Sequence, residues 1–174
     1  RFLKETVYLY PAKDLLFYHA DLRGKQLVSS RMETIQALLL GEGCTVITTF
    51  DAFMDSLLPI ETIRERVFSL KVGDIIDFEK VQKDLTLLGY EREVQIEGPG
   101  QFAVRGGILD VYPLTEEVPV RIELWDDEID SIRTFDVESQ RSIENLEEIT
   151  IYPASEFMDD KTKRVSFLDY FPRE

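Results

Sequence analysis

The sequence predicts an α/β region followed by an α+β region with an antiparallel sheet, and three features support this fold class. The first is a succession of strand, helix and strand within residues 6–49. The second is a helix over residues 77–88 whose apolar side chains share one face. The third is a series of short alternating segments from residue 101 onward, separated by loops that contain glycine, proline or acidic residues.

The α/β region begins with Thr6–Tyr10, which predicts a short apolar strand that ends at a proline. Ser30–Leu40 has the apolar spacing of a helix, and Thr45–Thr49 predicts a second strand. Asp51–Leu58 predicts another helix, with its first residue as the N-cap. Pro59 would end this helix, so we expect a domain boundary near it.

The α+β region is expected to begin with helices over Glu61–Leu70 and Asp77–Leu88, the second of which would end at Gly89. From Gln101 the sequence predicts an antiparallel meander, and Glu156–Glu174 predicts the start of a further element. The buried face of the second helix would carry Val81, Leu85 and Leu88. The loops of the meander are expected at Gly106-Gly107, Pro113–Pro119 and Asp126–Glu128, with a last strand near Ile149–Tyr152.

The composition bounds the possible functions. The 174 residues carry a formal net charge of −14, and 44% of them are hydrophobic, which suffices for a packed core. The acidic balance opposes non-specific nucleic-acid binding, because phosphate contacts need clustered lysine and arginine. The single cysteine, Cys44, rules out an internal disulfide framework and agrees with a cytoplasmic location. No apolar run suggests membrane insertion, and the missing initial methionine suggests a piece of a longer protein.

Charged and aromatic side chains share one side of the predicted strand that ends at Trp125. Arg121, Glu123 and Trp125 alternate with apolar residues, and Arg105 in the preceding segment likewise points away from the apolar side. Two arginines, a carboxylate and an indole would therefore share an exposed face and form a docking surface. The alternative is that each arginine only balances a neighbouring carboxylate and that a helix covers the indole.

Motifs for catalysis or metal binding are weak. The apolar strand before Asp127-Glu128 resembles the end of a Walker B strand, but we prefer a turn because the sequence has no glycine-rich phosphate loop with a lysine. His19 is the only histidine, and it and Cys44 are assigned structural roles. We expect no catalytic, cofactor-binding or metal site in this chain.

The most distinctive segments of the chain are LKVGDIIDFEKVQKDLTLLGYERE, GQFAVRGGILDVYP, VRIELWDDEIDSIRTFDVESQRS and ITIYPASEF. Together they resemble the amino-terminal, UvrB-like module of the bacterial transcription-repair coupling factors (Mfd). The resemblance implies that residues 1–60 are the C-terminal part of a degenerate RecA-like domain. It also implies that residues 61–154 form an α+β domain similar to UvrB domain 2, and that residues 155–174 begin the return to the helicase-like domain.

The resemblance further implies a recruitment module that binds UvrA, the damage-recognition ATPase of nucleotide excision repair. Arg105, Arg121 and Glu123 match contact residues of the family, and Trp125 stands where the family usually has phenylalanine. Glu123 is expected to hold Arg121 or to meet a basic group. The module would not be an enzyme, whereas the parent protein would be an ATP-dependent DNA translocase that binds RNA polymerase and DNA through other domains.

Three alternatives are considered. A fragment of UvrB is the nearest, but UvrB should carry a long aromatic-rich hairpin before the helix at Ser30–Leu40, where this chain has one short aromatic pair. A helicase-type ATPase would use Asp127-Glu128 as its metal-binding pair, and the absent phosphate loop counts against it. A DNA-binding module is opposed by the acidic balance.

Overall fold

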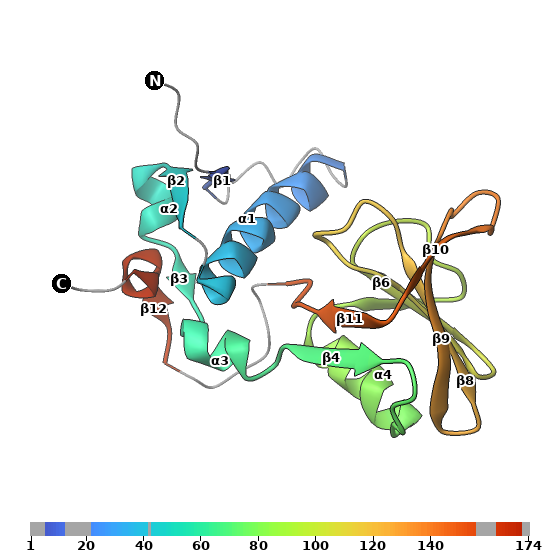
Figure 1. Ribbon diagram of the computed structural model, residues 1–174. Coiled ribbons are helices and arrows are strands. Elements are labelled where there is room, and N and C mark those ends of the chain that lie inside the picture. Colours follow the sequence, from blue (N-terminus) through green and yellow to red (C-terminus); the bar gives the residue numbers. More distant parts are fainter. Residues whose placement is uncertain (1–5, 13–21, 42, 156–162, 172–174) are drawn as a thin grey trace. The chain divides into compact units, whose positions relative to one another are not determined.

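The computed structural model describes residues 6–12, 22–41, 43–155 and 163–171 (Figure 1). The chain divides into two compact units. Unit 1 comprises residues 1–65 and 160–174, and unit 2 comprises residues 66–159. Helices and antiparallel sheets occur together, as the sequence predicted, and the RecA-like identity of the first region stays a prediction. None of the described helices is long and apolar enough to cross a membrane.

Unit 1 contains the predicted succession of strand, helix and strand. β1 (Thr6–Tyr10) and β2 (Cys44–Thr48) pair in parallel, and α1 (Leu22–Leu40) lies between them in the chain. The helix begins earlier than the apolar spacing predicted. Arg31 of α1 is buried and forms an ion pair of 2.8 Å with Asp55. This pair connects α1 to the segment that follows β2.

The prediction of a helix over Asp51–Leu58 is wrong for the second half of this range. α2 spans only Phe50–Phe53, and its N-cap is Thr49, whose side chain accepts a hydrogen bond from a backbone amide of the first turn. The segment Ser56–Leu57 forms β3 instead, which pairs antiparallel with β12 (Val165–Ser166). A partner strand from the far end of the sequence therefore overrides the local helical preference.

The described part of the C-terminal segment packs into unit 1. After β12, η1 (Phe167–Tyr170) forms a short 3₁₀ helix. The ring of Phe167 stacks on Tyr10 with 3.8 Å between centroids, and the Tyr170 hydroxyl donates a hydrogen bond to the Leu58 carbonyl. The element expected to begin in Glu156–Glu174 is therefore present in residues 163–171, and the rest of that range lies outside the described residues.

The prediction of a helix over Glu61–Leu70 is likewise wrong for the second half of this range. α3 spans Ile60–Arg64, and β4 (Phe68–Lys71) follows as a strand antiparallel to β11 (Glu148–Ile151). β11 corresponds to the strand predicted near Ile149–Tyr152, but it pairs outside the meander. Apolar residues of both strands are buried, so this long-range pairing decides the local structure.

Unit 2 is built around a six-stranded sheet with the order β10-β9-β8-β7-β6-β5 (Figure 1). Neighbouring strands are antiparallel, except that β5 pairs in parallel with β6. The predicted meander is confirmed, and β5 and β10 form the two edges. The strands are β5 (Glu91–Glu93), β6 (Gln101–Arg105), β7 (Ile108–Tyr112), β8 (Val120–Trp125), β9 (Glu128–Phe135) and β10 (Ser142–Leu146).

The helix predicted over Asp77–Leu88 is confirmed. α4 (Phe78–Leu87) begins after Asp77, whose side chain accepts a hydrogen bond of 3.0 Å from the Lys80 amide. The chain leaves the helix at Gly89, whose φ of +89° favours glycine. The buried apolar residues of unit 2 include Val81, Leu85 and Leu88 from this part of the chain, and Phe102, Leu109, Val111, Val120, Ile122 and Ile132 from the sheet.

Candidate functional site

The predicted face is formed by residues that pair across neighbouring strands of the six-stranded sheet. Asp110 of β7 lies opposite Arg121 of β8, and Arg121 lies opposite Arg133 of β9. Directly opposite residues of antiparallel strands point to the same side of a sheet. The two residues that flank Arg121 in the chain are buried, as the alternation predicted. We call this side the arginine face; its residues are Arg105, Asp110, Arg121, Glu123, Trp125 and Arg133.

Asp110 joins the two arginines that the sequence singled out. Its side chain is only 1% exposed. Arg121 donates to it through Nε at 2.7 Å and through Nη2 at 2.8 Å, a bidentate arrangement. Arg105 donates to it through Nη2 at 2.9 Å. This role of Asp110 was not predicted, although the alternation that places Arg121 on this side of the sheet also places Asp110 there.

Arg121 is held from several directions. Its guanidinium carbon lies 4.2 Å from the centroid of the Phe135 ring, and its Nη2 also donates to Gln140 Oε1 at 2.7 Å. Hydrogen bonding to Asp110 raises the pKa of Arg121 above its ordinary value. Its side chain is 14% exposed, whereas that of Arg105 is 46% exposed. Arg105 therefore offers more of its guanidinium to a partner than Arg121 does.

Glu123 forms its ion pair with Arg133 instead of with Arg121. The Ser131 hydroxyl donates a hydrogen bond of 3.4 Å to the same carboxylate. Both members of the pair are partly exposed, and the Nε atom of Arg133 is buried with no hydrogen-bond partner among the described residues. The structure thus supplies a basic group for Glu123 from this chain, and its role toward a partner stays a prediction.

Trp125 is the most exposed member of the arginine face. It ends β8 at the turn of the β8–β9 hairpin, and 80% of its surface is exposed. Asp126 has a φ of 58°, the left-handed conformation that tight hairpin turns require. The predicted turn is therefore confirmed, although Glu128 already belongs to β9. With this exposure, no described helix of unit 2 covers the indole.

Asp127-Glu128 belongs to the turn and the second strand of the β8–β9 hairpin. The Asp127 carbonyl accepts a hydrogen bond of 2.9 Å from the Ile76 amide, which places this residue in the hairpin. Among the described residues, no group of three or more histidine, cysteine, aspartate or glutamate side chains is placed to hold a metal ion. Cys44 is partly buried in β2, and His19 lies outside the described residues.

Comparisons with known proteins show the family to which the chain is related. Residues 68–157 match the family model described as the UvrB interaction domain, and this range contains every residue of the arginine face. The chain is 40% identical over 154 residues to a protein of Staphylococcus aureus (strain MRSA252) named transcription-repair-coupling factor. A protein of the same name from Bacillus subtilis (strain 168) is 38% identical over 167 residues.

The chain corresponds to a small part of these relatives. The matches cover 88% and 94% of the chain but only 13% and 14% of the Staphylococcus aureus and Bacillus subtilis proteins. The resemblance to transcription-repair coupling factors inferred from the sequence is thereby confirmed. Because the family model covers more than half of its residues, the chain belongs to the UvrB interaction domain family.

Proposed function

We propose that the chain is a non-catalytic recruitment module of a transcription-repair coupling factor and that its arginine face binds UvrA. The observation that carries this proposal is the juxtaposition of the paired arginines and an 80% exposed indole on one side of the sheet. Arginine and tryptophan are the side chains most enriched at energetically important positions of protein interfaces. The match to an interaction-domain family and the names of the relatives support the same function.

Two parts of the face would contribute differently to binding. Arg105 shares one carboxylate with Arg121, so the two positive charges face a single internal negative charge. The excess positive charge and the exposed donors of Arg105 suit a carboxylate of UvrA. Arg121 would act mainly by fixing Asp110, and through it Arg105. Trp125 would enter an apolar recess, where truncation of such an anchor typically costs about 2 kcal/mol or more.

The rest of the parent protein would supply the other activities. ATP-dependent movement along DNA and contact with RNA polymerase would belong to segments outside this chain, and unit 1 would be part of a RecA-like domain. The module would work in the cytoplasm. A fragment of UvrB is less well supported, because the relatives named above are coupling factors.

Binding of the 174-residue chain to immobilised UvrA tests the proposal. We expect Arg105→Ala to weaken binding by about tenfold or more, because a central interface arginine is lost. Arg64→Ala is the matched control, since Arg64 is 52% exposed and also ion-paired but lies in α3. Circular dichroism checks that both variants fold. Equal affinity of the folded Arg105→Ala variant and the unsubstituted chain, or no binding by the unsubstituted chain, would contradict the proposal.

A further inference from the structure

A second large apolar side chain lies on the same side of the sheet as Trp125. Ile75, in the loop between β4 and α4, forms an antiparallel bridge with Glu128, and Glu128 pairs with Trp125 in the β8–β9 hairpin. Paired residues point to the same side, so Ile75, Glu128 and Trp125 form a row across three adjacent segments. Ile75 is 75% exposed. The hairpin therefore presents two exposed apolar side chains with one carboxylate between them.

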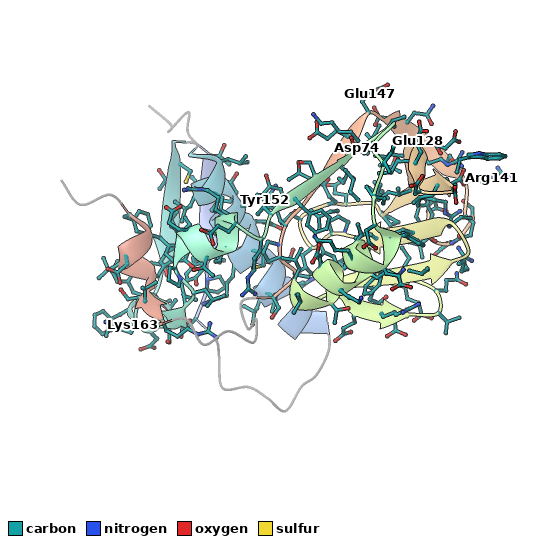
Figure 2. All side chains as sticks on the ribbon, turned by 90° about the horizontal axis from the view of Figure 1, so that it is seen from below. Asp74, Glu128, Arg141, Glu147, Tyr152 and Lys163 are labelled. Atoms are coloured by element: carbon teal, nitrogen blue, oxygen red, sulfur yellow. The ribbon has the colours of Figure 1, made fainter. Side chains whose placement is uncertain are left out.

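Backbone hydrogen bonds hold Ile75 in this place. The Gly73 amide donates to the Ile129 carbonyl at 2.8 Å, and the Ile129 amide donates to the Asp74 carbonyl at 2.9 Å. On the other side of Ile75, the Ile76 amide donates to Asp127 at 2.9 Å. Figure 2 shows Asp74 and Glu128 close together at this end of unit 2. Because the loop is bonded on both sides of Ile75, little backbone ordering is needed when a partner binds.

The row continues the arginine face. On this side of β8, Glu123 lies between Arg121 and Trp125. The ion pair of Glu123 with Arg133 therefore lies between the cluster of Arg105, Asp110 and Arg121 and the tip of the hairpin. Around the apolar pair the described side chains are acidic: Asp126, Asp127 and Glu128 are all exposed. One end of the face is thus cationic, and the other carries two apolar side chains with carboxylates between and beside them. A complementary partner surface therefore needs acidic groups opposite the arginines and basic groups opposite the hairpin tip.

We propose that Ile75 and Trp125 act together as one anchor, which enters an apolar recess of the partner that also offers a basic side chain to Glu128 between them. The inference rests on the proposed function, since the recess would belong to the same UvrA surface whose carboxylate meets Arg105. Exposed apolar side chains that are fixed in a polar surround and adjoin a charged recognition cluster are typical of interface anchors. No motif in the sequence marks Ile75, because its bridge partner Glu128 lies more than fifty positions away.

Binding of Ile75→Ser to immobilised UvrA tests the anchor. We expect the affinity to fall about tenfold, because the buried apolar area at the interface is lost. Leu87→Ser is the matched control, since Leu87 is an exposed apolar residue of α4 outside the arginine face. The double variant Ile75→Ser/Trp125→Ala should lose less than the product of the two single losses, because both side chains would fill one recess.

The charge between the two apolar side chains is tested in the same assay. Glu128→Gln should weaken binding, and the difference from the unsubstituted chain should shrink as salt is raised. Unchanged affinity for folded Ile75→Ser, or a loss as large for Leu87→Ser, overturns the anchor. If Arg105→Ala still weakens binding in that case, the proposed function stands without the anchor. If the unsubstituted chain does not bind UvrA, the proposed function itself fails.

Discussion

The two sides of the six-stranded sheet are made by the same strands and differ in how they use burial. On one side, Leu109 and Ile122 are fully buried among apolar residues, as in an ordinary core. On the other side, Asp110 is buried to a similar extent but is paired with arginines. Burial of a charge is tolerated there because its hydrogen bonds are satisfied by Arg105 and Arg121. The first side is an apolar core, whereas the second holds a buried carboxylate within a network of arginine ion pairs.

The largest effect is expected from a substitution on the apolar side. Leu109→Ala should lower the free energy of unfolding by about 2–5 kcal/mol, because it leaves a cavity in a close-packed region. Ile108→Ala, at the adjacent position of β7 and only partly buried, should cost clearly less. Urea denaturation followed by circular dichroism measures both. Equal losses would mean that the two sides of the sheet do not differ as described.

A smaller loss is expected when the carboxylate of the arginine face is removed. Asp110→Ala should lower the free energy of unfolding by about 2–3 kcal/mol, because Arg121 loses its bidentate partner while it remains largely buried. The same denaturation experiment applies, with the exposed Asp130→Ala as control. A stability within about 0.5 kcal/mol of the unsubstituted chain would show that the ion pairs are not needed to hold this side.

The smallest effect concerns the loop that reaches Arg121 through Gln140. Hydrogen bonds from the Ser139 hydroxyl and amide hold the pKa of Asp136 below its usual value. The folded state therefore favours the charged carboxylate. The contribution of this carboxylate to the free energy of unfolding is complete at a pH above the pKa that it has in the unfolded chain. It is lost as the pH falls through the lower pKa that it has in the folded chain. The Gln140 backbone amide donates to the Asp136 backbone carbonyl at 2.8 Å, and the hydrogen bonds from Ser139 to the Asp136 carboxylate close the same turn. Because protonation of the carboxylate weakens the bonds from Ser139, this turn should loosen under acidic conditions.

An NMR pH titration of the Gln140 side-chain amide checks this prediction. The midpoint of its pH-dependent shift should lie below the ordinary aspartate pKa of about 3.9, and Ser139→Ala should move this midpoint to higher pH. A transition at the same pH with and without the Ser139 hydroxyl would show that this hydroxyl does not set the pKa of Asp136.

The sequence predicted those parts of the molecule whose structure depends on local pattern. The meander, α4 with its stop at Gly89, and the side of Arg121 follow from alternation, helical spacing and turn residues. The sequence did not predict β3 and β4. Each of these strands is fixed by pairing with a strand about eighty or more positions away, and such pairing has no local signal in the sequence. Asp110 and Ile75 were missed for a related reason: their significance lies in cross-strand neighbours.

The central claim is that the arginine face, with Trp125 at its tip, contacts UvrA. Hydroxyl-radical footprinting of the chain alone and in a saturated mixture with UvrA tests this directly, because exposed indole rings oxidise readily. We predict that oxidation of Trp125 falls sharply in the complex while that of the exposed Met54 in unit 1 is unchanged. Undiminished oxidation of Trp125 in a saturated complex would contradict the account and place the binding surface elsewhere on the chain.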